Sequence, residues 1–386
     1  MGSTSGRRVR SLPEGSRLLL GAALHRDERA VADWRTWWAQ TGSLDGLDVG
    51  EYRLIPLVYR NLKSRGYGDA AELGRLHGIY RQTWLRNRIA EARLVEVVDA
   101  LDGIGIDSLT LKGMALVGVA YSESGVRPMN DIDLLIHGRD LRRAVSELNA
   151  RGWTFSQGRS GEELRFARLF HAVALSHPSR IELDLHRHML EESNWRSSDD
   201  GVWERRQHMT LSGHSLWTMS PADHLLHLVV HGVRWDPVPP IRWVADAVTL
   251  IRANQIDWDV VVREAERRGV SLAVGAGLRF LRSEFEPSIP DHTLAMIESL
   301  PSGRLERLDF RFQHAGAGAF AQVSRYVTRY LRLTSRRNPW ERLRMFPLYL
   351  RAMWGLESAW AIPMDGLRRT WIRARGGDPG RSSAPP

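Results

Sequence analysis

Arg127-Pro-Met-Asn-Asp-Ile-Asp-Leu-Leu-Ile136 lies near the middle of this chain of 386 residues and carries its strongest structural signal. Residues 131–136 are apolar apart from two aspartates, and this pattern predicts a β-strand. In a strand, residues i and i+2 point to the same side, so Asp131 and Asp133 lie about 6.5–7 Å apart along one face. Two carboxylates placed together repel each other unless a cation neutralises them, so the pair predicts a divalent-metal site.

A third carboxylate commonly completes a two-metal site, and Ile181-Glu-Leu-Asp-Leu-His186 offers one on a second predicted strand. Asp184 is the expected third ligand. Glu182 shares its face and competes for the role, while His186 could orient a carboxylate or contact phosphate. The alternative is that Asp131 and Asp133 are two solvated acids on an exposed strand face, because Asp-x-Asp alone is common.

A possible phosphate-binding turn precedes the aspartates, in Thr110-Leu-Lys-Gly-Met-Ala-Leu116. It joins a predicted strand to a short helix, and Gly113 would let the backbone approach a triphosphate at the helix N-terminus. Lys112 could offset phosphate charge, as could Arg127. The alternative for Lys112 is a solvated lysine at a strand end. Lysine occurs only at positions 63 and 112, against 52 arginines, which favours a specific role for Lys112.

These segments resemble the bacterial "uncharacterised nucleotidyltransferase" family of the DNA-polymerase-β-like superfamily. The resemblance covers about residues 50–270, with an upstream part at 51–59 and downstream parts at 220–231 and 242–246. Its central motifs are Leu111-Lys-Gly113, Tyr121, Arg127–Leu135 and Asp184-Leu-His186. It implies a polymerase-β-like palm with a mixed sheet. Lys112-Gly113-Met114 departs from the superfamily's usual Gly-Ser turn, so the serine hydroxyl expected near the triphosphate is missing.

The resemblance implies in-line transfer of a nucleoside monophosphate from ATP or another nucleoside triphosphate to a hydroxyl acceptor. Asp131, Asp133 and Asp184 would be catalytic and would hold two Mg²⁺, with Mn²⁺ a possible substitute. Asp184 would also help to deprotonate the acceptor, which could be a small molecule, a protein or RNA. Lys112, Gly113 and Arg127 would cradle the triphosphate. The alternative is a module that binds nucleotide or RNA without turnover and acts as a regulatory or assembly partner.

The composition is that of a packed protein without thiol chemistry. The chain is 43% hydrophobic and 26% charged, and it contains no cysteine, which excludes disulfides, thiolate nucleophiles and Cys-ligated metals. No apolar run approaches the roughly 18–20 residues that a membrane-spanning helix needs, so we expect a cytoplasmic protein. The net charge of +9 comes from residues 301–386, which hold 16 arginines against 6 acidic residues.

The hydrophobic pattern predicts a mixed α+β fold, in which a palm is flanked by N-terminal and C-terminal helical regions. Its predicted parts are a disordered tail (1–16), a helical region (17–102), the palm (103–215), a helical domain (216–300) and a basic, aromatic-rich helical tail (301–386). Residues 325–375 could contact RNA or an anionic surface; alternatively they form a helical subdomain with an aromatic core. His224, His227 and His231 share one helix face, and we expect a structural or substrate-side role for them.

Overall fold

The computed structural model describes residues 12–68, 71–156, 164, 169–234, 241–315, 319–354, 356, 358–365 and 368. A seven-stranded mixed sheet lies at the centre of the palm, in the order β3-β4-β5-β2-β1-β7-β6. The pairs β2–β5 and β1–β7 are parallel, and the other neighbours are antiparallel. The strands are β1 (Ser108–Thr110), β2 (Asp131–Ile136), β3 (Thr154–Phe155), β4 (Ala172–Ser176), β5 (Glu182–His186), β6 (Gln207–Leu211) and β7 (His214–Thr218).

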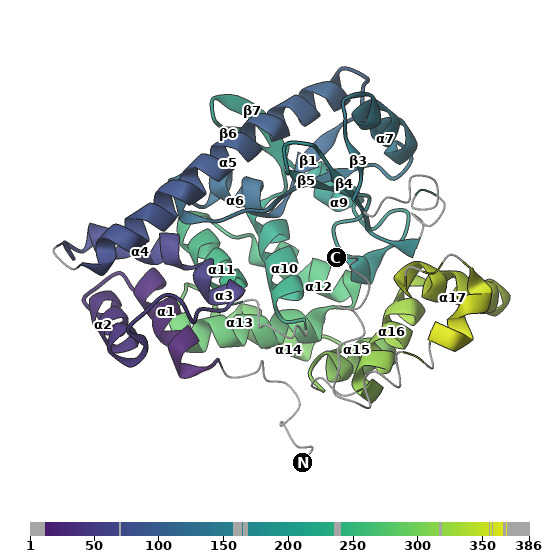
Figure 1. Cartoon of the computed structure of the whole chain (residues 1–386). Coiled ribbons are helices and arrows are strands. Elements are labelled where there is room, and N and C mark those ends of the chain that lie inside the picture. Colours follow the sequence, from purple (N-terminus) through teal and green to yellow (C-terminus); the bar gives the residue numbers. More distant parts are fainter. Residues whose placement is uncertain are drawn as a thin grey trace, which may run out of the picture.

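Helices precede, interrupt and follow the sheet (Figure 1). Before it come α1 (Glu14–Leu24), α2 (Arg29–Thr41), α3 (Val49–Tyr52), α4 (Ile55–Ser64) and α5 (Glu72–Asp102). Within it are α6 (Lys112–Val119), η2 (Ser124–Val126), α7 (Leu141–Ala150), η4 (Glu191–Ser193) and α9 (Asp200–Glu204). After it come α10 (Pro221–Gly232), α11 (Arg242–Ala253), α12 (Trp258–Arg268), α13 (Ser271–Phe285), α14 (Asp291–Ser299), α15 (Arg304–Gln313), α16 (Ala319–Leu333), α17 (Pro339–Trp354) and η5 (Ala359–Ala361).

Two hydrophobic clusters cover the two faces of the sheet. Ile132, Leu134 and Ile136 of β2 are buried in one cluster with apolar side chains of α5 and α7. Leu135 points the other way, into a larger cluster that joins the N-terminal helices to α10–α14. Each such side chain contributes about 1.5–3 kcal/mol when fully buried. Because Asp131 and Asp133 alternate with the first set, they lie on the Leu135 face, toward the helices.

Most elements expected around the palm are confirmed. The strand at 131–136 has the predicted bounds, and the second predicted strand, at 181–186, is β5. The mixed α+β class is therefore confirmed. The hairpin of β6 and β7 was not predicted, although Ser212-Gly213 supplies its turn with two positive φ angles. Helix α1 begins at Glu14, inside the segment 1–16 expected to be disordered, and residues 1–11 lie outside the described residues.

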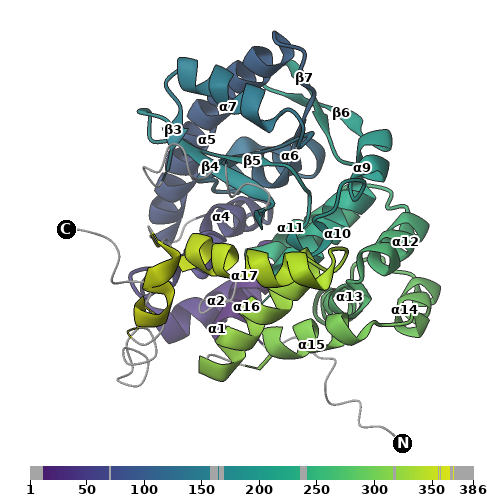
Figure 2. The same cartoon turned by 90° about the vertical axis from the view of Figure 1, so that its right-hand side faces the viewer.

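The C-terminal helices pack beside the palm rather than extending from it (Figure 2). Tyr330 and Tyr349 are buried in a small cluster with Leu169, which precedes β4. Arg329 pairs with Glu191 of η4. Tyr330 and Tyr349 thus form a small aromatic core in the described part of the tail, whereas Trp340, which a helical subdomain was expected to bury, is exposed. Contact of residues 325–375 with RNA or an anionic surface stays a prediction. Among the described residues, no helix is long and apolar enough to cross a bilayer.

Helix α10 is central to the helical half, and glycines let its neighbours approach closely. A Cβ on Gly232 would lie 2.1–2.5 Å from ring atoms of Trp243 on α11. A Cβ on Gly277 of α13 would lie 2.4 Å from a methyl group of Val229 on α10. Both contacts are shorter than van der Waals packing allows, so α10–α11 and α10–α13 packing depends on these two glycines.

We expect Gly232→Ala to lower the free energy of unfolding by about 1–3 kcal/mol, because the added methyl group overpacks the α10–α11 contact. Gly78→Ala is the matched control. Its Cβ would meet nothing within 4 Å, and alanine favours the interior of α5 by about 0.5–1 kcal/mol. Urea unfolding followed by circular dichroism measures both. Equal midpoints for Gly232→Ala and the unsubstituted protein would contradict the close packing.

Candidate metal centre

The parallel pairing of β2 with β5 creates the site. In this register Asp133 lies opposite Asp184, and Asp131 lies opposite Glu182. Neighbouring strands are about 4.8 Å apart, so the Asp133 and Asp184 side chains project side by side from the same face of the sheet. The predicted convergence of these two carboxylates is therefore present, although their strands are far apart in sequence.

Asp133 is the most constrained of the acids, with a side chain only 2% exposed. One of its oxygens, Oδ1, lies 2.6 Å from Lys112 Nζ and 3.0 Å from His186 Nε2. Burial by itself would raise the pKa of Asp133, but the Lys112 charge and the His186 hydrogen bond hold it well below its usual range. Asp133 is therefore ionised and fixed in position at neutral pH.

The pKa of Asp184 is shifted in the opposite direction from that of Asp133. Its partial burial and the Asp133 charge raise its pKa, and the nearby charges of Lys112 and His186 only partly offset them. Asp131, at the start of β2, is half-buried and adds to the negative charge that Asp184 senses. Glu182 is exposed. The site therefore concentrates negative charge around Asp133 and Asp184, with Glu182 toward solvent.

One set of potential metal ligands emerges among the described residues. Asp133, Asp184 and His186 each offer a ligand atom, and these three atoms lie within 4.8 Å of one another. The set differs from the sequence prediction in one member: His186 joins the two aspartates, whereas Asp131 lies outside this distance. A donor set of two carboxylates and one imidazole suits a divalent cation such as Mn²⁺.

His186 is buried beneath a second histidine. The His171 ring lies 5.2 Å from that of His186, and neither Nδ1 atom has a hydrogen-bond partner among the described residues. Burial and the neighbouring positive charges lower the pKa of His171 well below its usual value, so it is neutral. The sequence analysis did not single out His171. Its position just before β4, antiparallel to β5, is the only signal that could have indicated it.

Lys112 begins α6 with a backbone φ of 44°. This left-handed conformation is unfavourable for a residue with a Cβ and persists only where the surrounding structure enforces it. Burial lowers the pKa of Lys112, but the Asp133 charge outweighs it, and the net result is a raised pKa and a charged ammonium. Lys112 thus lies beside the carboxylates and is paired with Asp133, and its contact with a triphosphate stays a prediction.

Gly113 has a structural reason to be glycine. A Cβ there would lie 2.5 Å from Arg127 Nη1 and 2.8 Å from Met129 Sδ. The side of Gly113 where a Cβ would project is therefore filled by the protein itself. Its predicted close approach to a triphosphate stays a prediction.

Arg127 is directed away from the carboxylates and into the helical half. Its Nε and Nη2 atoms each donate to Asp246 of α11 at 2.8 Å, and Tyr121 donates to the same carboxylate at 2.7 Å. Arg127 and Asp246 are both almost fully buried. Neighbouring Arg242 adds positive charge and donates to the Pro128 carbonyl. Nucleotide contact by Arg127 stays a prediction; in this structure its guanidinium fastens the palm to α11.

The α10 histidines lie above the same face of the sheet. His224 Nε2 is 2.8 Å from the Thr218 hydroxyl, which itself donates to the Thr110 carbonyl. Burial lowers the pKa values of His224 and His231 to about 3 and that of His227 well below its usual value. These histidines are therefore neutral. His224 has the structural role expected, and His227 is close enough to sense the charges of Lys112 and Asp133.

The geometry agrees with a comparison of the sequence with known families. Residues 50–286 match the family described as "Uncharacterised nucleotidyltransferase". The chain belongs to this family. The resemblance carried by the Leu111-Lys-Gly113 and Arg127–Leu135 segments is thereby confirmed. Membership in the uncharacterised nucleotidyltransferase family suggests nucleotidyl transfer as the reaction class and names neither a substrate nor an acceptor.

A solved structure that the chain resembles is described as an "antigenic nucleotidyltransferase-like protein from Paracoccidioides brasiliensis". It is 16% identical, with 55% of this chain and 95% of that chain covered and a TM-score of 0.35. A TM-score this low carries no argument about the site. No curated protein matches the chain.

Arg127→Met is expected to lower the free energy of unfolding by about 3–5 kcal/mol at pH 7.5, because it leaves Asp246 charged and unpaired in the core. The loss should shrink as pH falls. In the unsubstituted protein burial raises the Asp246 pKa, but Arg127 lowers it overall, so the stability from the pair is lost only below about pH 4. In Arg127→Met, burial raises the pKa of Asp246 because the Arg127 charge is gone. Asp246 then becomes protonated at a higher pH than in the unsubstituted protein, and its protonation removes the cost of the buried charge.

Urea unfolding of both proteins at pH 7.5 and pH 4.5 measures this difference. The control is Arg142→Gln, at an exposed arginine of α7. A stability difference that stays constant between the two pH values would show that Arg127 does not neutralise Asp246.

Proposed function

We propose that this protein is a divalent-metal-dependent nucleotidyltransferase that moves a nucleoside monophosphate from a nucleoside triphosphate to a hydroxyl acceptor. The observation that carries the proposal is the convergence of Asp133, Asp184 and His186 within 4.8 Å, beside the ammonium of Lys112. Family membership supports the reaction class. The acceptor oxygen would bond to the α-phosphorus as the bond to the leaving pyrophosphate breaks.

The donor chemistry fits a divalent cation. Asp133, Asp184 and His186 would hold it, with Asp131 at the strand start available for a second ion or for substrate-bound metal. When bound, such a cation polarises phosphoryl oxygens and neutralises charge that develops on them. Two carboxylates suit Mg²⁺ or Mn²⁺, and the imidazole favours Mn²⁺ of the two.

The roles of the remaining groups follow from their positions. Without a cation, His186 Nε2 donates to Asp133; a cation held by Asp133, Asp184 and His186 would replace this hydrogen bond. Lys112 lies 2.6 Å from the same oxygen that a cation would need. We infer that a bound cation displaces this contact and that Lys112 then supplies its positive charge to the triphosphate. Asp184, beside Asp133, would accept the proton of the acceptor hydroxyl.

The runner-up is a module of the same fold that binds nucleotide or RNA without turnover. Activity separates the two readings.

Asp133→Asn is expected to lower nucleotidyl transfer at least about 10³-fold, since several kcal/mol of charge stabilisation are lost. Asp184→Asn should act similarly. Glu182→Gln, which changes an exposed acid on the same strand, should leave the rate within about twofold. The protein is incubated with each ribonucleoside triphosphate, Mg²⁺ or Mn²⁺, and a cell extract. Pyrophosphate release and nucleotide-sized mass shifts are then measured.

Circular dichroism confirms that each variant is folded. Transfer that survives both Asp133→Asn and Asp184→Asn would contradict the assigned site. Absence of transfer by the unsubstituted protein with every triphosphate and metal would favour the non-catalytic module.

His186→Gln is expected to weaken Mn²⁺ binding about 10–100-fold, because it removes the group that orients or completes the ligand set. Electron paramagnetic resonance of free Mn²⁺ during titration measures this without any substrate. His208→Gln, at a histidine of the edge strand β6, is the control. Unchanged Mn²⁺ affinity in His186→Gln would exclude His186 from the site.

A further inference from the structure

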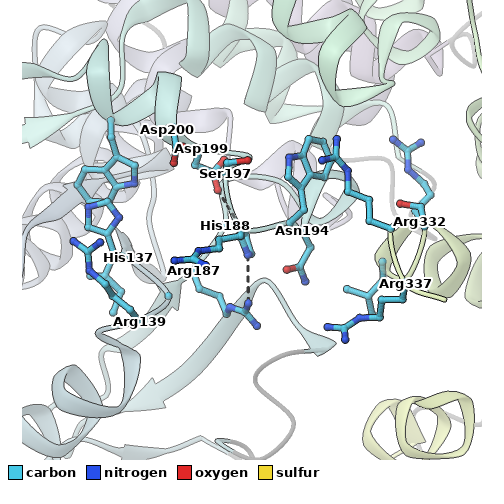
Figure 3. Close-up of a pocket in the computed structure, with 18 residues that line it drawn as sticks. His137, Arg139, Arg187, His188, Asn194, Ser197, Asp199, Asp200, Arg332 and Arg337 are labelled. Carbon is cyan, nitrogen blue, oxygen red and sulfur yellow. Dashed lines mark hydrogen bonds and ion pairs between the residues drawn. The ribbon is translucent and has the colours of Figure 1, made fainter. Parts of the chain in front are cut away.

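A cavity of about 690 Å³ lies beyond the carboxylate cluster, at the ends of β2 and β5 (Figure 3). One wall is formed by residues 136–139, which end and follow β2, and by Arg187 and His188, which follow β5. The opposite walls are residues 194–203 and the corner between α16 and α17 at 332–337. This volume is typical of a small-molecule site.

Arginine dominates the lining of this cavity. The six arginines come from four separate segments of the chain, so only the tertiary structure brings them together. Two acids also line it. One of them, Asp199, is buried and already neutralised by Arg268 at 3.1 Å, with His188 and Ser198 each 3.0 Å away. The arginines are Arg139, Arg187, Arg196, Arg332, Arg336 and Arg337.

The arginines of the cavity are of two kinds: some are bound to other groups of the protein, and others are exposed. Arg332 donates to Asp309 at 3.0 Å and to the Gly269 carbonyl at 2.8 Å, which anchors the α16–α17 corner to the helical half. Arg336 and Arg337 extend from that corner and are exposed, with Glu341 3.9 Å from Arg337 at the surface. Arg196 is exposed as well. The cavity therefore presents several guanidinium groups on an anchored frame.

The aromatic rings of the cavity are already covered. The His137 ring stacks on Trp203 at 4.1 Å, and Trp203 is buried. Arg336 lies over the Trp195 ring at 4.5 Å. Base recognition in single-stranded nucleic acid relies on open aromatic faces. The faces of these rings are occupied by His137 and Arg336, which favours a ligand recognised through its phosphates.

We propose that this cavity binds a small molecule carrying two or more phosphate groups. Arginine suits phosphate because its planar fork donates two parallel hydrogen bonds. The site differs from the carboxylate cluster: His186 belongs to that cluster, whereas Arg187 and His188, which follow β5, line the cavity. The inference does not depend on the transfer reaction proposed above.

Isothermal titration of the full-length protein with inorganic tripolyphosphate, in EDTA, tests the proposal. We expect saturable one-to-one binding, weakened about tenfold or more in Arg336→Gln/Arg337→Gln, because charge-assisted contacts are lost. The matched control is Arg86→Gln/Arg142→Gln, which removes the same charge from exposed arginines of α5 and α7. It should change affinity by less than about twofold. Asp133→Asn should retain binding, which separates this site from the carboxylate cluster.

Four outcomes would overturn the proposal: no saturable binding, equal weakening by both double substitutions, an unchanged affinity in Arg336→Gln/Arg337→Gln, or loss of binding in Asp133→Asn. A short single-stranded RNA provides a fifth test. If RNA binds more tightly than tripolyphosphate and loses affinity in the same double variant, the surface serves nucleic acid and the small-ligand assignment is wrong.

Discussion

The repulsion between the carboxylates of Asp133 and Asp184, which are held side by side and largely out of solvent, is the constraint on which the rest of this site depends. The parallel register of β2 and β5 places Asp133 beside Asp184, and burial strengthens their repulsion. Lys112 relieves it at 2.6 Å from Asp133, at the expense of a left-handed backbone at the start of α6. The strained residue is thus the one that supplies the compensating charge, as is common where a fold serves a function.

The position of Lys112 depends in turn on a second buried ion pair. Arg127 reaches Asp246 of α11 and packs against Gly113, the residue after Lys112. The loop before β2, the first turn of α6 and the helical half are therefore held as one unit. Arg127 therefore helps to keep the carboxylates aligned without contacting them. Such alignment is important because small displacements of reacting groups lower the rate of catalysis.

Some arginines of the basic C-terminal region form ion pairs within the protein. Arg329 pairs with Glu191, and Arg332 pairs with Asp309. Tyr330 and Tyr349 form a core against Leu169. Arginines that remain exposed at the α16–α17 corner face a cavity lined by other segments. A surplus of arginine in a sequence therefore predicts a positively charged surface. Which arginines remain exposed to bind a ligand depends on the ion pairs that form in the folded protein.

The sequence by itself determined the local features. Apolar residues around two aspartates defined β2, and the spacing of Asp131 and Asp133 placed them on one strand face. It could not determine which distant groups meet. The Arg127–Asp246 pair, the grouping of His186 with Asp133 and Asp184, and the arginine-lined cavity all join segments far apart in the chain. Periodicity reports the direction of a side chain relative to its own backbone, whereas strand register and helix packing decide what it meets.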